Sequence, residues 1–376
     1  MMDDRYRLVL RRTTAAKENI PYYEIQTTNR SREAMNRRHI GRCVFVLSFL
    51  FALALDTSAQ ESSQRDGRNN QERRMDKIQD EEIAIDEASL TPVWFSERAP
   101  EAGTEIIYYY KKTPVGQLVV KLHFPKEWKK TDKRVGAIFF HGGGWKSEAT
   151  DQVSGQFEKD CALLASHGIV AANAQYRGID RNERRADLCV EDAKSAVRWF
   201  RGHAGELGMD PNRLIMAGGS AGGHLSLAVH TTKGYDAPED DVAVSCRPNI
   251  LVLFNPAFDA TAEHRATRFL TAEDARACSP IHHLDATIPP AILMYGLEDA
   301  ILEEGKQYLE SARKLGLVAE LWTAEGQKHA FFNHDPWKAV TMRLMEQFLE
   351  KHGFLSGSPT VETVPGAAMK LSDTAP

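Results

Sequence analysis

The sequence predicts an α/β protein with a mostly parallel central sheet and helices on both faces. From about residue 135 onward, short β-rich runs alternate with stretches of helical spacing, which is typical of βαβ units. The 376 residues are 42% hydrophobic and 26% charged, enough apolar material for one large domain with tails. The formal net charge of −5 indicates no basic surface, so nucleic acid is not expected as a partner.

The predicted strands fall into two groups in chain order. An antiparallel pair comes first, because "TEIIYYY" and "GQLVVKLHF" are rich in β-formers and are separated by Thr113-Pro114-Val115. The runs that follow alternate with helical stretches, so they are expected to pair in parallel. These runs are "VGAIFF", "GIVAANAQY", "RLIMAGG", "NILVLFNP", "AILMYG" and "VAELWTA".

The helical stretches carry apolar residues at spacings of three and four. In the clearest of them, Val190, Ala193 and Val197 share one face. A glycine follows each of the other two expected helices, because glycine is favoured just after the end of a helix. The expected helices are Asp187 to His203, Leu302 to Leu315 before Gly316, and Trp337 to His352 before Gly353.

The N-terminal part has the layout of a secretory signal peptide at residues 35–59. Three arginines precede an apolar run of about thirteen residues, Cys43 to Leu55, and small residues follow up to Ala59. We therefore expect cleavage after Ala59 and a secreted or periplasmic protein; an uncleaved anchor is the alternative. Signal peptides begin at their charged end, so Met35 rather than Met1 is the expected start, and residues 1–34 are interpreted as a mis-annotated extension.

The remaining segments are separated by composition. Residues 60–90 are densely charged without apolar periodicity and are interpreted as a linker or leading segment. Residues 91–355 are the expected catalytic domain, and residues 356–376 are the expected polar tail. Four cysteines outside the signal fit no zinc spacing; disulfides and isolated thiols both stay open for them. They are Cys161, Cys189, Cys246 and Cys278.

A serine among glycines is the first candidate functional residue. In "LIMAGGSAGGHL", residues 218–222 fit G-x-S-x-G between an expected strand and an expected helix. Serine is a weak nucleophile unless a base and oxyanion donors lie close to it, and small neighbours allow that presentation. Ser220 is therefore the candidate nucleophile. A glycine-rich anion-binding turn is the alternative, although the lysine of a P-loop is lacking.

A second glycine cluster, His141-Gly142-Gly143-Gly144-Trp145, follows the strand "VGAIFF". Glycines can turn backbone N–H groups inward without interference from Cβ atoms. Gly143 and Gly144, with Ala221 after the serine, are the expected oxyanion-hole donors. Trp145 either stacks on a substrate acyl or sugar group or anchors the loop.

Together the two clusters resemble the HGGG-bearing branch of α/β-hydrolase esterases and lipases, related to hormone-sensitive lipase, over roughly Glu105 to His352. The resemblance implies the chain order serine, acid, histidine. Asp299 matches the family's Gly-x-x-Asp pattern and would orient the base. His329 matches Gly-x-x-His-x-Phe and would be that base. No cofactor is implied.

This chain departs from the family pattern at three positions. Gly219 stands where much of the branch has aspartate, Ala300 where proline is usual, and Ala330 where glycine is frequent. None of these changes removes a catalytic group.

Other polar residues receive structural interpretations. A base on the same helix as Ser220 could not face the substrate, so His224 is expected to be structural. Asp192 and Tyr176-Arg177 occupy positions where the family has supporting residues. His282 is a candidate for the pocket rim; adjacent histidines without a third ligand do not predict a metal.

The expected function is a secreted serine hydrolase that cleaves carboxylic esters through an acyl-enzyme. The only obvious cap insertion lies between "LVLFNPAF" and "AILMYG". An exported, minimally capped domain with "HGGGW" resembles carbohydrate esterases, so short-chain, acetyl or feruloyl esters, including polysaccharide-linked ones, are the expected substrates. The alternatives are a broad carboxylesterase or lipase, a peptidase, and a non-catalytic adhesion protein on the same fold.

Overall fold

The computed structural model describes residues 9–14, 21–26, 91–146, 152–179 and 185–375. The chain divides into two compact units, residues 1–87 and 88–376. In the first unit, strands β1 (Val9–Thr14) and β2 (Pro21–Gln26) pair antiparallel. The expected signal peptide and charged segment lie wholly outside the described residues, and the expected extension lies partly outside them.

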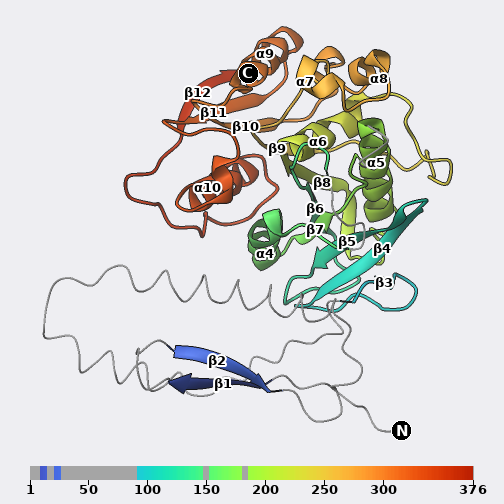
Figure 1. Cartoon of the computed structure of the whole chain (residues 1–376), viewed down its shortest axis with the longest axis vertical. Coiled ribbons are helices and arrows are strands. Elements are labelled where there is room, and N and C mark those ends of the chain that lie inside the picture. The colour runs from blue at the N-terminus through green and yellow to red at the C-terminus, as the bar shows by residue number, and fades with distance from the viewer. Residues whose placement is uncertain (1–8, 15–20, 27–90, 147–151, 180–184, 376) are drawn as a thin grey trace, which may run out of the picture. The chain divides into compact units, whose positions relative to one another are not determined.

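The second unit contains a ten-stranded sheet in the order β12-β11-β10-β9-β8-β6-β7-β5-β4-β3 (Figure 1). The six adjacent strands β11, β10, β9, β8, β6 and β7 pair in parallel, and so do β3 and β4 at the other edge. The pairs β4–β5, β5–β7 and β11–β12 are antiparallel. The predicted α/β class is thereby confirmed. The strands are β3 (Val93–Trp94), β4 (Glu105–Thr113), β5 (Gly116–His123), β6 (Arg134–Phe140), β7 (Val170–Ala174), β8 (Met209–Gly219), β9 (Ile250–Phe254), β10 (Ala291–Gly296), β11 (Ala319–Ala324) and β12 (Lys370–Ala375).

Helices connect these strands on both faces of the sheet (Figure 1). The α-helices are α4 (Glu158–Ser166), α5 (Ala186–Gly202), α6 (Ala221–Thr231), α7 (Glu263–Ala266), α8 (Ala272–Ala277), α9 (Leu302–Leu315) and α10 (Trp337–Lys351). The 3-10 helices are η1 (Gly155–Phe157), η2 (Pro280–His282) and η3 (Phe331–Asn333). Each helix predicted from periodicity is present within a residue or two of its expected bounds.

Alternation along the central strands divides the core into two hydrophobic clusters. On β6, Ile138 and Phe140 face the cluster that contains α5, α6 and α9, whereas Ala137 and Phe139 face the cluster that contains α4 and α10. Successive side chains of a strand point to opposite faces, so each central strand supplies both clusters. This two-sided burial explains why these runs are almost continuously apolar in the sequence.

The C-terminal segment corrects an expectation. Residues 356–376 were expected to be a polar tail beyond the domain, but residues 370–375 form β12 and pair with β11 at the edge of the sheet. Most of β12 is exposed while Ala375 is buried, and Met369 joins the hydrophobic core beside it. An edge strand with one solvated face needs few apolar residues, which is why composition alone did not indicate it.

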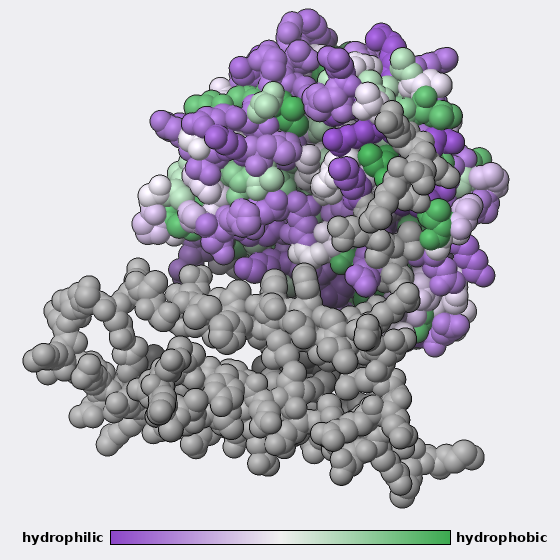
Figure 2. Space-filling model, viewed as in Figure 1, coloured by the Kyte–Doolittle hydropathy of each residue, from purple (hydrophilic) through white to green (hydrophobic). Residues whose placement is uncertain are grey.

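The four cysteines of the described region are free thiols, and burial raises the pKa of each. None of the helices in that region combines the length and apolar character that crossing a membrane requires. On the face drawn in Figure 2, hydrophilic residues predominate and hydrophobic ones are scattered. Such scattered residues mark no site by themselves.

Candidate active site

The loops that carry the candidate residues all follow the carboxyl ends of parallel strands. The HGGG segment follows β6, Ser220 follows β8, Asp299 follows β10 and His329 follows β11. Parallel strands end at a common edge, where α/β sheets bind their ligands. The fold therefore brings together residues that are far apart in the sequence.

Ser220 occupies a sharp turn between β8 and α6. Its φ of 53° and ψ of −114° lie in a region that residues other than glycine rarely adopt. The backbone of Ser220 is held on both sides: its N–H donates to the Phe254 carbonyl (2.9 Å) and its carbonyl accepts from the His224 N–H (2.9 Å). A Cβ at Gly222 would overlap the Phe140 carbonyl, so glycine there lets α6 pack directly against the end of β6.

Three polar side chains form a hydrogen-bonded chain at this turn. His329 Nε2 lies 2.9 Å from Ser220 Oγ, and His329 Nδ1 lies 2.8 Å from Asp299 Oδ2. A carboxylate only accepts hydrogen bonds, so Nδ1 carries the proton and Nε2 is left to accept from the serine hydroxyl. The Asp299 side chain is fully buried and the His329 side chain is 39% exposed, so the base is open to substrate and water.

Two neighbouring contacts hold the acid and the base in place. Asp299 Oδ1 also accepts from the Ile301 N–H (3.0 Å), which fixes the carboxylate at the start of α9. The Ala330 N–H, next to the histidine, donates to Asn255 Oδ1 (2.9 Å). Asn255 is fully buried at the end of β9. Ala330 itself has a φ of 67°, in the left-handed region.

The HGGG loop lies beside the serine. Gly143 and Gly144 have φ values of 99° and 65°, which glycine adopts without strain. A Cβ at Gly142 would lie 3.4 Å from Ser220 Cβ. Within the described part of the chain, the N–H groups of Gly143 and Gly144 have no acceptor, and the N–H of Ala221 belongs to the first turn of α6, which leaves it unused. These are the three groups predicted as oxyanion donors.

Trp145 anchors the loop, and its ring does not face the substrate. The side chain is 1% exposed, its Nε1 donates to His224 Nδ1 (3.1 Å), and its ring lies edge-on to Phe269. Arg268, from the segment between α7 and α8, lies over the same ring and donates to the Gly144 carbonyl (2.8 Å). Of the two roles left open for Trp145, these contacts favour anchoring of the loop, because the ring is buried in the core under it.

The two other histidines singled out in the sequence, His224 and His282, have different surroundings. His224 is fully buried, and its Nε2 donates to the Cys278 carbonyl (2.6 Å) while Nδ1 accepts from Trp145. Burial lowers the pKa of His224 to about 4, so the ring stays neutral and structural. His282 lies in η2 with its Nε2 3.7 Å from Asp259 Oδ1. The described contacts do not bring His282 to the triad.

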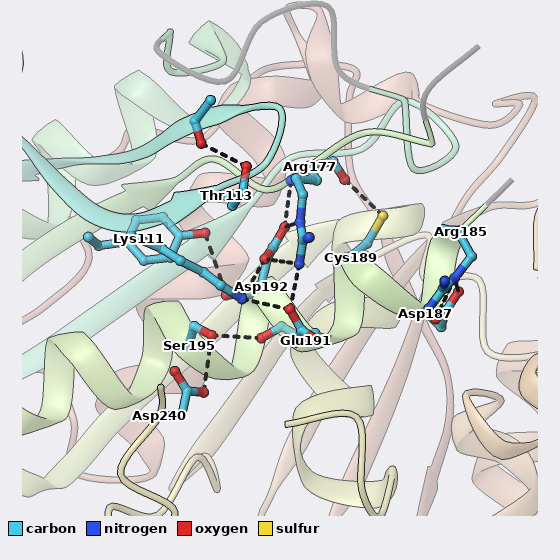
Figure 3. Close-up of polar contacts among 12 residues, drawn as sticks. Lys111, Thr113, Arg177, Arg185, Asp187, Cys189, Glu191, Asp192, Ser195 and Asp240 are labelled. Carbon is cyan, nitrogen blue, oxygen red and sulfur yellow. Dashed lines mark hydrogen bonds and ion pairs between the residues drawn. The ribbon is translucent and has the colours of Figure 1, made fainter. Parts of the chain in front are cut away.

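A buried charge cluster supports the loop after β7 (Figure 3). Arg177 Nε lies 2.7 Å from Asp192 Oδ2, and Lys111 Nζ lies 2.8 Å from Asp192 Oδ1 and 2.9 Å from Glu191. The adjacent Tyr176 donates from its hydroxyl to the His141 carbonyl (2.8 Å) and stacks on the His141 ring. The cluster thereby supports the HGGG loop through Tyr176.

One group of described residues has metal-ligating side chains close together, namely Glu105, His123 and Glu158. The ammonium group of Lys121 already contacts both carboxylates, at 2.7 Å and 2.5 Å. The Lys121 ammonium group therefore already balances the charge of the two carboxylates. Hydrogen bonding to His123, together with Lys121, holds the pKa of Glu105 at about 2 against the effect of burial.

Sequence reasoning missed Gln156, Asn255 and Asn333. Gln156 Oε1 accepts from the Gly142 N–H (2.7 Å), and its Nε2 donates to Asn333 Oδ1 (2.9 Å). Each partner is distant in the sequence, and amide residues in loops are common, so no local pattern identifies them. Only the spatial arrangement assigns them to the site.

The known proteins to which this chain is similar include esterases and carboxylic ester hydrolases. The BD-FAE family model matches residues 121–250, which include both glycine clusters. The solved structure of esterase Est2 from the Planctomycetes species Thermogutta terrifontis is 35% identical with a TM-score of 0.62; the match covers 70% of this chain and 97% of that one. Its propionate-bound structure is also 35% identical, with a TM-score of 0.62, and the match covers 69% of this chain and 98% of that one.

Two curated relatives come from Mycobacterium tuberculosis. The probable carboxylic ester hydrolase LipM is 27% identical over 55% of this chain and 52% of the relative. The carboxylic ester hydrolase LipN is 24% identical over 68% of this chain and 71% of the relative. The matches thus span about half to seven-tenths of these relatives.

Proposed function

This chain belongs to the α/β-hydrolase esterases, and from that membership we propose that it is a serine hydrolase that cleaves carboxylic esters through an acyl-enzyme. The observation that carries the proposal is the hydrogen-bonded chain from Ser220 through His329 to Asp299, with links of 2.9 Å and 2.8 Å. Nucleophile, base and orienting acid lie within the distances that such catalysis requires.

Acylation begins at the serine hydroxyl. Ser220 Oγ attacks the ester carbonyl carbon while His329 Nε2 accepts the hydroxyl proton, and Asp299 stabilises the resulting imidazolium. The N–H groups of Gly143, Gly144 and Ala221 meet the charge that develops on the carbonyl oxygen. His329 then returns the proton to the alcohol oxygen as the old C–O bond breaks.

Deacylation repeats the sequence with water as the nucleophile. His329 takes a proton from water, which attacks the acyl carbon, and then returns it to Ser220 Oγ as the acid leaves. The exposed part of the His329 side chain gives water access to the base. No cofactor or metal enters any of these steps.

We infer that the acyl group is short or is linked to a carbohydrate. The insertion between β9 and β10 holds only the short helices α7 and α8, and its Arg268 reaches the Gly144 carbonyl of the HGGG loop. The Thermogutta terrifontis esterase has been solved with propionate and with butyrate bound. A small insertion of this kind suits short acyl groups on bulky or polymeric alcohols better than long lipid chains, so acetyl and feruloyl esters are the proposed class.

Hydrolysis of p-nitrophenyl acetate tests the activity. Ser220→Ala is expected to lower kcat by about 10⁴-fold or more, because a triad acts as a unit. Wild-type turnover by this variant would reject the mechanism. Inactivity of both the wild type and Ser220→Ala would instead favour the non-catalytic alternative.

A substrate panel tests the specificity. Esters from acetate to palmitate, acetylated xylan, methyl ferulate and a peptide anilide separate the proposed class from a lipase and a peptidase. The highest kcat/KM is expected on acetate or on a carbohydrate ester. A maximum at palmitate would support the broad lipase alternative, and cleavage of the anilide would support the peptidase.

We also propose that the protein is exported with cleavage after Ala59. The charged, apolar and small segments of residues 35–59 motivate this. N-terminal sequencing of the exported protein is expected to begin at Gln60. Precursor peptides from upstream of Met35 would instead exclude Met35 as the start.

A further inference from the structure

Gln156 links two loops that carry different parts of the candidate site. Its Oε1 accepts from the Gly142 N–H (2.7 Å), and its Nε2 donates to Asn333 Oδ1 (2.9 Å). A backbone N–H can only donate, so the oxygen of the amide must face Gly142 and the nitrogen must face Asn333. The glutamine therefore forms a directional bridge with one donor and one acceptor.

The backbone around Gln156 is held in place by a hydrogen bond from Lys338 and by the packing of Phe157. Lys338, at the start of α10, donates to the Gln156 carbonyl (3.2 Å) and forms a buried ion pair with Asp160 of α4. Phe157, next to the glutamine, is fully buried and stacks on Phe332. Side chains locked by packing and ion pairs hold a site more accurately than those on free loops.

Both ends of the bridge are close to reacting groups. Gly142 directly precedes the oxyanion donors, and a Cβ at Gly142 would lie 3.4 Å from Ser220 Cβ. Asn333 lies in η3, the short helix that follows His329. The oxyanion donors and the imidazole must face the same tetrahedral carbon from two sides, so their separation affects the barrier.

We propose that Gln156 is a positioning residue that fixes the oxyanion loop relative to the His329 loop. This inference rests on the proposed ester hydrolysis and adds to it a determinant of rate that is outside the triad. Because the bridge acts on transition-state geometry, its loss lowers kcat more than it raises KM.

Gln156→Met is the primary test. Methionine has a similar length but neither donates to Asn333 nor accepts strongly from Gly142. On p-nitrophenyl acetate, kcat per titrated active site is expected to fall about 10- to 100-fold, since outright loss of an oxyanion donor costs about 10² to 10³. KM is expected to change less than about threefold. Gln347→Met, on the exposed face of α10, is the matched control and is expected to behave as wild type.

Variants of Asn333 test the other end. Asn333→Asp keeps an acceptor for Gln156 Nε2 and is expected to retain kcat within about threefold, whereas Asn333→Leu loses it and is expected to lower kcat. The double variant Gln156→Met/Asn333→Leu is expected to be no slower than Gln156→Met alone, because one bridge is broken in both. Additive losses would contradict a shared bridge.

A transition-state readout separates positioning from folding. A boronic acid that adds to the serine is expected to bind Gln156→Met more weakly by the factor lost in kcat, with thermal denaturation showing a folded protein. Wild-type kcat per active site in Gln156→Met, together with an inactive Ser220→Ala, would overturn the inference and leave the proposed function intact. An active Ser220→Ala would overturn both.

Discussion

Ala330, next to the candidate base, has a backbone conformation that suits glycine better. Its φ is 67°, and an alanine there costs roughly 1 kcal/mol relative to glycine. The Ala330 N–H still donates to Asn255, so the strain maintains a contact beside His329. The family frequently has glycine after the histidine, and the φ value gives the physical reason for that preference.

Ala330→Gly is therefore expected to raise the free energy of unfolding by about 0.5 to 1 kcal/mol and to leave kcat within about twofold. Urea denaturation and ester hydrolysis measure the two quantities. Ala339→Gly, inside α10, is the control with the opposite sign and is expected to destabilise by about 1 kcal/mol. A loss of stability in Ala330→Gly would contradict the strain argument.

The surroundings of Gly219 explain why this chain departs from the family pattern at position 219. A Cβ at this position would lie 2.6 Å from Phe332 Cζ and 3.3 Å from Phe157 Cζ. Both rings are buried, so a side chain at position 219 has no room beside them. The aspartate that much of the branch has here is sterically incompatible with this pair of phenylalanines.

Gly219→Ala is expected to lower the free energy of unfolding by about 1 to 3 kcal/mol through overpacking. Chemical denaturation measures the loss. Gly202→Ala, where a Cβ meets nothing within 4 Å, is the control and is expected to lose no stability. Equal stability of Gly219→Ala and wild type would show that the rings adjust freely.

At the scale of elements, strand composition predicted the sheet well where strands are buried on both faces. The runs from "VGAIFF" to "VAELWTA" became β6 to β11 because continuous apolar sequence is what a central parallel strand requires. β12 was missed because "KLSDTA" is an edge strand with a solvated face. Helix α4 was not predicted either; its nine residues have a weak apolar periodicity.

Removal of β12 tests the contribution of that edge. Truncation after Gly366 removes Met369 and Ala375 from the core and exposes the hydrogen-bonding edge of β11. The thermal midpoint is expected to fall and aggregation on heating to increase. Lys370→Ala, which removes only an exposed ion pair with Glu325, is the control and is expected to change little. An unchanged midpoint after truncation would mean that the edge strand is dispensable.

In the candidate site, the residues that belong to sequence motifs were predicted, and those that belong to none were missed. Ser220, His329 and Asp299 stand in patterns that resemble a family, and the structure brings them within hydrogen-bond distance. Gln156 and Asn333 make long-range side-chain contacts, which no local spacing encodes. The role of Trp145 could not be decided because a tryptophan after the glycines suits a pocket and a core equally well.

For the whole molecule, histidines with lowered pKa values predict how stability depends on pH. Burial lowers the pKa of His141, His224, His230, His282 and His352 below the ordinary value. The unfolded chain then binds more protons than the folded chain below about pH 6.5, so stability falls as pH falls through that range. Carboxylates with lowered pKa values, such as Glu105 at about 2, also stabilise the folded state, and this stabilisation is lost only below about pH 4.5.

The free energy of unfolding is therefore expected to decrease between pH 7 and pH 5, as urea denaturation at unit steps would measure. His224, with its pKa of about 4, contributes up to about 1.4 kcal/mol per pH unit below pH 6.5. His224→Gln is expected to be less stable at pH 8 but to have a shallower slope. An unchanged slope in this variant would exclude His224 as a source of the dependence.

The insertion between β9 and β10 has an evolutionary consequence. β9 and β10 are adjacent parallel strands whose register is set by their own pairing, so residues 260–290, which follow Asn255 and its neighbours, can change in length without shifting the sheet. Ser220, Asp299 and His329 all lie outside this insertion, whereas Arg268 within it reaches the Gly144 carbonyl. The insertion is thus an exchangeable module: a lineage that replaces it changes the support of the oxyanion loop and with it the ester preference, while the triad is inherited unchanged.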